Sequence, residues 1–110
     1  MFDNIHINRL PLVFKSLEGK NYFQFHINGQ LASLEYDLVK DHCLRLKFLE
    51  IGKYLNRSEV RNALIARVME YSIRGKFKII TSNLEVLAFL EKHPEYEKLI
   101  ASDVAPITGQ

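Results

Sequence analysis

The hydrophobic period of this 110-residue chain changes from that of strands to that of a helix at Gly52. Before Gly52, apolar residues alternate with polar ones, which is typical of half-buried strands. From Arg57 to Arg74 they recur every three or four residues, which is typical of a helix with a broad buried face. A strand at Lys76 to Thr81 and a second helix follow. This order predicts an α+β fold in which helices pack on a sheet.

A β-hairpin is predicted around residue 28. Tyr22 to Ile27 is aromatic and β-branched, and Gln30 to Leu38 resumes an alternating pattern. Asn28-Gly29 between them favours the positive φ angles of a type I′ turn. Within the second run the apolar residues change parity, so we expect a bulge or register change near Ala32.

A third strand is predicted at Cys43 to Ile51, where apolar and basic residues alternate. This alternation indicates an antiparallel strand with one face on a core. One or two weaker strands are expected around Pro11, at Ile5 to Asn8 and at Leu12 to Lys15. The apolar side chains of the third strand that are expected to face the core are Leu44, Leu46 and Phe48.

Both helices carry sequence signals at their ends. Asn56 with Glu59 three residues later resembles a capping box, and Ser82 with Glu85 resembles a second one. Gly75 is suited to the left-handed conformation that follows a last helical turn. The first helix is therefore expected to end at about Arg74, and the second to begin directly after Ser82.

Composition predicts one domain that spans residues 1–110, with a disordered tail from about residue 103. Hydrophobic residues make up 47% of the chain, which is enough for one core. The net charge of +2 is spread along the sequence, so a nucleic-acid or membrane partner is not expected. One cysteine and no export signal favour the cytoplasm. Cys43 is interpreted as a small buried residue or, alternatively, as a reactive thiol.

The second helix ends in a recognisable sequence, His93-Pro94-Glu95-Tyr96. The residue before a proline is disfavoured in a helix, so a short terminal helix is expected to begin at Pro94. The segment from Val68 to Ile100, VMEYSIRGKFKIITSNLEVLAFLEKHPEYEKLI, resembles the C-terminal half of the small N-acetyltransferases of the GNAT superfamily. Members of that family end in a similar strand, helix and His-Pro-Glu-Tyr turn.

The resemblance implies a mixed, mostly antiparallel sheet that is splayed open to hold acetyl-CoA as cosubstrate. The cofactor would lie between Phe48 to Ile51 and Lys76 to Thr81. Its pantetheine arm would pair with the backbone of Leu49 to Ile51, and its pyrophosphate would rest on the helix that starts near Arg57. Backbone amides and the helix dipole together favour anions at such a position.

The predicted phosphate-binding turn departs from the family. Members carry an arginine-glycine-rich loop, RGxGxG, where this chain has Asn56-Arg57-Ser58-Glu59-Val60-Arg61. The three glycine positions hold side chains, and Glu59 would repel a phosphate. Arg57 and Arg61 could offset this by direct contact, or could be solvated residues of a first helical turn. The predicted cofactor-binding residues are Leu49, Ile51, Asn56, Arg57, Ser58, Val60, Arg61 and Asn62.

Three residues are candidates for chemistry. Glu50 aligns with a glutamate of the family's third strand and could act as a base through a water, or be an ordinary strand residue. Asn83 could donate to the thioester, or only cap a helix. Tyr96 could act as an acid with His93 orienting it, or both could anchor the terminal helix.

Two functions therefore follow from the sequence. The first is a small acetyl-CoA-dependent N-acetyltransferase that transfers an acetyl group to a small-molecule or protein amine. The second is a catalytically inactive GNAT-fold protein that binds a protein or another ligand through the same cleft. No metal site is expected, because the four histidines show no ligand spacing. The chain is expected to be a monomer or weak homodimer.

Overall fold

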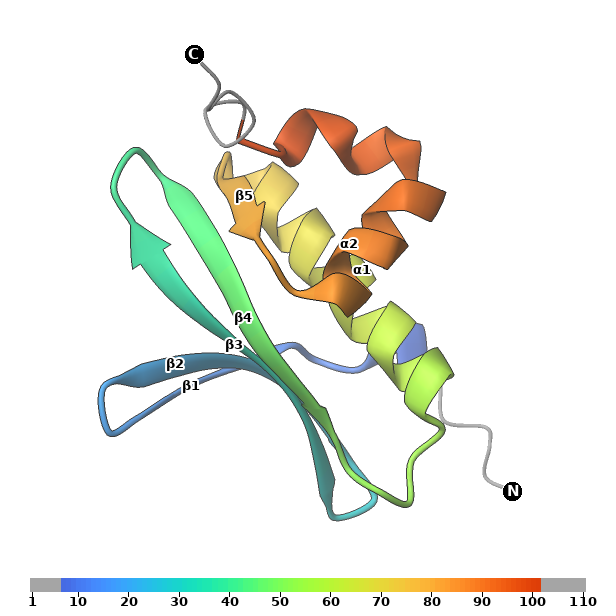
Figure 1. The fold of residues 1–110 in the computed structure, drawn as a ribbon. Helices are drawn as coiled ribbons and strands as arrows, with labels where there is room; N and C mark the ends of the chain where they lie inside the picture. Colours follow the sequence, from blue (N-terminus) through green and yellow to red (C-terminus); the bar gives the residue numbers. More distant parts are fainter. Residues whose placement is uncertain (1–6, 102–110) are drawn as a thin grey trace.

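The computed structural model describes residues 7–101, which form a five-stranded sheet with helices on one face (Figure 1). The strands lie side by side in chain order. The first four pair antiparallel, and the fifth pairs parallel with the fourth. The predicted α+β class with a mixed, mostly antiparallel sheet is confirmed. The strands are β1 (Val13–Leu17), β2 (Lys20–Ile27), β3 (Gln30–Val39), β4 (Cys43–Ile51) and β5 (Lys78–Thr81).

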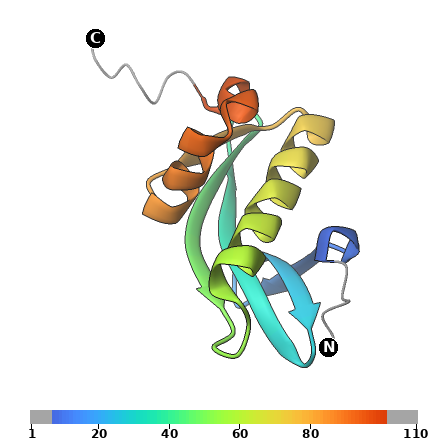
Figure 2. The ribbon, with the colours of Figure 1, turned by 90° about the vertical axis from the view of Figure 1, so that its right-hand side faces the viewer.

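Helix α1 (Arg57–Gly75) connects β4 to β5 and crosses one face of the sheet (Figure 2). A parallel pair requires a long connection of this kind. Helix α2 (Leu84–Lys92) and the 3₁₀ helix η2 (Pro94–Leu99) follow β5, and the 3₁₀ helix η1 (Ile7–Arg9) precedes β1. The strand predicted at Ile5 to Asn8 is therefore wrong for residues 7 and 8. Its first part and the predicted tail from residue 103 lie outside the described residues.

Two tight turns join the first three strands. Asn28 and Gly29 have φ angles of 51° and 78°, so the predicted type I′ turn between β2 and β3 is confirmed. Glu18 and Gly19 have φ angles of 53° and 82° and form a second turn of this kind between β1 and β2. Both turns keep the right-handed twist of the strands they connect.

Strand β4 contains a bulge. Tyr36 lies opposite Leu46 and Leu34 lies opposite Leu49, so two steps along β3 match three steps along β4. The β2–β3 ladder is regular through Ala32, and so is the pairing of Ala32 with Ile51. The prediction of an irregularity near Ala32 is therefore wrong. The observed bulge is in β4, opposite the segment from Leu34 to Tyr36 of β3.

The bulge reverses which side chains of β4 face the core. Leu44 and Leu46 are buried before it, and Leu49 and Ile51 pack against the core after it. Phe48, predicted to face the core, is 70% exposed on the opposite face. One extra residue shifts the two-residue period by one, so every later side chain changes face.

The core lies between the sheet and α1. Val60, Leu64, Val68 and Met69 of α1 are buried against Phe23, Phe25, Leu34 and Leu46 of the strands. Aromatic rings add to this layer: Phe23 stacks on Tyr36 with ring centroids 4.1 Å apart and meets Phe14 and Tyr71 edge-on. The predicted buried face of the first helix is confirmed.

Helix α1 begins as predicted and ends one residue later. The Asn56 side chain accepts a hydrogen bond from the amide of Glu59 at 3.1 Å. Gly75 is the last helical residue, and Lys76 takes the left-handed conformation with φ of 61°. The prediction of Gly75 for that conformation is therefore wrong. Gly75 is needed for space instead, because a Cβ there would lie 2.6 Å from the ring of Phe77.

Tyr96 anchors η2 to α1. Its hydroxyl donates to Glu70 of α1 at 2.8 Å, and the ring is buried. His93 donates from Nδ1 to the carbonyl of Phe89 at 2.8 Å and stacks on the Phe89 ring with centroids 3.9 Å apart. Tyr96 therefore ties η2 to α1, whereas the contacts of His93 with Phe89 stabilise the end of α2.

Raising the pH above 10 is expected to weaken this anchor. Burial and the hydrogen bond to Glu70 raise the pKa of Tyr96 from 10.0 to about 12. The unfolded chain loses this proton first, so the stabilisation is complete below pH 10 and is lost as the pH rises through 12. The loss corresponds to about 2–3 kcal/mol. Denaturant titrations across this range should show it, and Tyr96→Phe should remove it. An equal loss of unfolding free energy in the unaltered protein and in Tyr96→Phe would contradict the assignment of this loss to Tyr96.

Candidate active site

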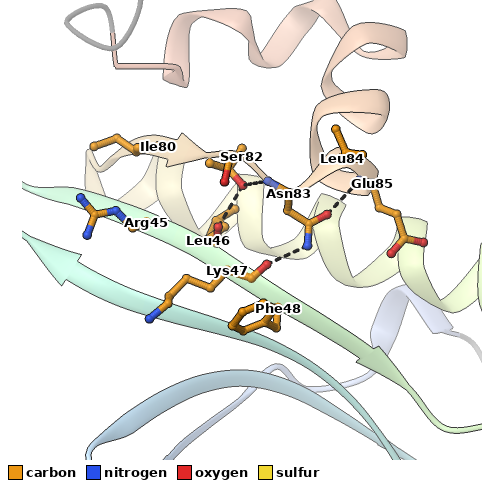
Figure 3. Close-up of a pocket in the computed structure, with 10 residues that line it drawn as sticks. Arg45, Leu46, Lys47, Phe48, Ile80, Ser82, Asn83, Leu84 and Glu85 are labelled. Carbon is orange, nitrogen blue, oxygen red and sulfur yellow. Dashed lines mark hydrogen bonds between the residues drawn. The ribbon is translucent and has the colours of Figure 1, made fainter.

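Strands β4 and β5 part next to the segments between which the family resemblance implies a cleft. Their parallel pairing runs from Cys43 opposite Lys78 to Leu46 opposite Thr81 and stops there, while β4 continues to Ile51. A cavity of about 630 Å³ opens at this point between β4, β5 and the start of α2 (Figure 3). Its lining residues are Arg45, Leu46, Lys47, Phe48, Ile80, Thr81, Ser82, Asn83, Leu84 and Glu85.

Polar side chains close the inner end of the cleft. The hydroxyl of Thr81 donates to the carbonyl of Leu46 at 2.9 Å. Nδ2 of Asn83 donates to the carbonyl of Lys47 at 2.7 Å (Figure 3). Two consecutive carbonyls of β4 therefore face the same edge, as a bulge allows. These contacts replace the strand ladder and fix the separation of β4 from α2.

Asn83 also caps α2. Its Oδ1 accepts from the amides of Glu85 at 2.8 Å and Val86 at 3.1 Å. Ser82, predicted as the cap, precedes it and is exposed, so the helix begins one residue later than predicted. One N–H of the Asn83 amide group is used by Lys47, and the group has a second donor.

Beyond the bulge, the edge of β4 is open toward the cleft. The amide of Gly52 donates to the carbonyl of Leu31 on β3 at 2.9 Å. Backbone groups of successive strand residues point to opposite edges. The backbone groups of Leu49 and Ile51 therefore point to the edge of β4 opposite β3. This is the edge with which the predicted pantetheine arm would pair.

Two amides in the first turn of α1 are already engaged by Asn56. The amide of Glu59 bonds the Asn56 side chain, and that of Val60 bonds the Asn56 carbonyl at 2.9 Å. The Val60 side chain is buried in the core. The amides of Arg57 and Ser58 are the first two of the helix and have no partner within it.

Arg57 and Arg61 both contact a carboxylate of α2. Arg57 Nη2 lies 2.8 and 3.0 Å from the two oxygens of Glu85, and Arg61 Nη1 lies 3.5 Å from one of them. Asn62 accepts from Arg61 Nε at 3.3 Å. Sequence reasoning missed Glu85 as a partner, because these contacts span 24 and 28 residues and follow no local pattern.

The other predicted catalytic residues lie outside this cavity. Glu50 is opposite Ser33 on the sheet face away from α1, where it borders a separate hollow of about 390 Å³ with Gln30 and Leu31. Tyr96 is bound to Glu70, as described above. Of the predicted catalytic set, Asn83 alone lines the cavity between β4 and β5.

A cluster of charged side chains, Glu35, Asp37 and Lys47, lies on the sheet face away from α1, beside the bulge. Lys47 Nζ lies 3.3 Å from Asp37 and 3.5 Å from Glu35, and Glu35 is only 5% exposed. The hydrogen bond to Asp37 raises the pKa of Lys47, so its ammonium stays charged. Sequence reasoning did not single out this cluster, although Glu35 and Asp37 share one strand face with Lys47 opposite.

Cys43 is buried, which agrees with its interpretation as a small core residue. Within residues 7–101, no group of three or more histidine, cysteine, aspartate or glutamate side chains is placed to hold a metal ion. Among the helices that the structure describes, none is both long and apolar enough to cross a membrane.

Comparison with solved structures finds a protein of the same fold. An NMR structure described as a "GCN5-like putative N-acetyltransferase" from Staphylococcus aureus is similar with a TM-score of 0.58 and 26% identity. The similarity covers 82% of this chain and 88% of that protein. No protein-family model and no curated protein matches the sequence. The sheet with its parted β4–β5 pair and crossing helix is therefore a GNAT-like fold.

Proposed function

We propose that this protein is a small N-acetyltransferase that transfers an acetyl group from acetyl-CoA to an amine. The observation that carries the proposal is the parting of β4 and β5 after Leu46 and Thr81, which opens a cavity in a GNAT-like fold. An extended arm with amide groups fits such an opening, because it can pair with an unpaired strand edge. Acetyl-CoA would supply the thioester.

The chain's own groups have separable roles in this proposal. The backbone of Leu49 and Ile51 would hold the pantetheine arm by strand-like hydrogen bonds. The second N–H of Asn83 would donate to the thioester carbonyl as negative charge develops on its oxygen. Glu50 would accept the proton of the incoming ammonium through water. The acceptor would approach from the sheet face away from α1, which carries Glu50 and the cluster around Lys47.

Acetyl-CoA is expected to raise the melting temperature. A ligand at about 100 times its dissociation constant adds roughly 2.7 kcal/mol of stability, which is several degrees for a domain of this size. Phe48→Ala removes an aromatic side chain of the cavity and should weaken binding about tenfold. Tyr54→Ala removes an exposed aromatic side chain outside the cavity lining and is the matched control. No shift at millimolar acetyl-CoA would refute the proposed enzyme.

The alternative function is a ligand- or protein-binding module without turnover. Two observations favour it: side chains replace the family's loop glycines, and Glu85 already pairs with Arg57 and Arg61. An assay for acetyl transfer to a panel of amines separates the two functions. Binding without thiol release would support the module, whereas thiol release that Glu50→Gln slows at unchanged acetyl-CoA affinity would support the enzyme.

A further inference from the structure

The carboxylate of Glu85 lies between two arginines of another helix, at the rim of the cavity. Both of its oxygens lie within 3.0 Å of Arg57 Nη2, and one lies 3.5 Å from Arg61 Nη1. Glu85 lines the cavity between β4 and β5 and also a second hollow beside Arg61 and Asn62. The arginines therefore already hold an anion that belongs to the chain.

A phosphate would use the same donors. Carboxylate and phosphate both present oxygens that match the planar guanidinium group. An incoming phosphate near Arg57 and Arg61 would meet the negative charge of Glu85 until that carboxylate moves away. Glu85 and a cofactor phosphate are thus competitors for one pair of cations.

We propose that Glu85 is a specificity-determining residue that weakens binding of phosphate-bearing thioesters relative to phosphate-free ones. The inference rests on the proposed function, since it assumes that a thioester occupies the cleft. The side chain of Arg57 is 51% exposed and that of Glu85 is 33% exposed, so solvent weakens the electrostatic attraction between them. Removing the carboxylate charge is expected to change phosphate affinity by about tenfold, which is the scale of a partly exposed charge contact.

The test compares two thioesters on two forms of the full chain. Acetyl-CoA carries the phosphates, and acetyl-pantetheine carries the same arm and acetyl group without them. Glu85→Gln keeps the size of the side chain and the backbone contact with Asn83 but removes the charge. Its affinity for acetyl-CoA should rise about tenfold at low salt, and the gain should shrink as salt screens the charges. Its affinity for acetyl-pantetheine should not change.

Glu91→Gln is the matched control, because Glu91 is an exposed glutamate on the same helix that lines a different hollow. This variant should bind both thioesters as the unaltered protein does. An equal or weaker affinity of Glu85→Gln for acetyl-CoA, with acetyl-pantetheine still bound, would overturn the inference and leave the proposed function standing. If neither thioester binds either protein, the proposed function fails and the inference fails with it.

Discussion

Replacing Phe23 by alanine is expected to destabilise the protein by about 3–5 kcal/mol. Phe23 is fully buried between the sheet and α1, where its ring contacts those of Tyr36, Phe14 and Tyr71. The substitution leaves a cavity in the core and removes three aromatic contacts at once. Because domains of this size are stable by about 5–15 kcal/mol, the variant should melt far below the unaltered protein or fail to fold.

Phe48→Ala is the control for this prediction. It is the same substitution in the same sheet, but Phe48 is 70% exposed because of the bulge in β4. We expect a change in unfolding free energy of no more than about 0.5 kcal/mol. Comparable losses in the two variants, measured by urea unfolding, would contradict the bulge and support the regular alternation that the sequence predicts.

Replacing Asn83 by alanine is expected to cost about 2–3 kcal/mol. The substitution removes the cap from two amides of α2 and leaves the carbonyl of Lys47 without its donor. Asn83→Asp separates these effects. A carboxylate still caps the helix, but it places negative charge 2.7 Å from the Lys47 carbonyl, so most of the loss from that contact should remain.

Ser82→Ala is the matched control for Asn83. Ser82 was predicted as the cap and instead lies exposed before it, so its replacement should change stability by less than about 0.5 kcal/mol. Thermal melting of the three variants distinguishes the two caps. A larger loss for Ser82→Ala than for Asn83→Ala would show that the helix begins at Ser82 in solution.

Local patterns predicted most of the fold. Alternation gave the bounds of β4, the Asn28-Gly29 turn fixed the β2–β3 hairpin, and three- and four-residue spacing located α1. Each of these signals lies within a few residues of the element it specifies. The bulge escaped prediction because Leu44, Leu46 and Phe48 continue an unbroken alternation, and only the pairing with β3 shows the extra residue.

The backbone features of the candidate site were predicted, but the contacts between side chains far apart in the sequence were not. The start of α1 at Arg57 follows from the capping residues Asn56 and Glu59, and the parting of the strands was implied by the family resemblance. The contacts of Glu85 with Arg57 and of Tyr96 with Glu70 join residues 28 and 26 positions apart. Such pairs depend on how α2 and η2 are placed against α1, which no local pattern specifies.

The short pairing of β5 with β4 has a consequence for the order of assembly. Cys43 and Lys78 are neighbours only after the whole crossover has folded, whereas the hairpins of β1 to β4 close over a few residues. Loop-closure entropy therefore delays this pairing, which is four residue pairs long. We expect the β4–β5 edge of the cavity to form after the hairpins and to unfold locally before them. Under the proposed function, such local opening would admit the thioester while the hairpins stay intact.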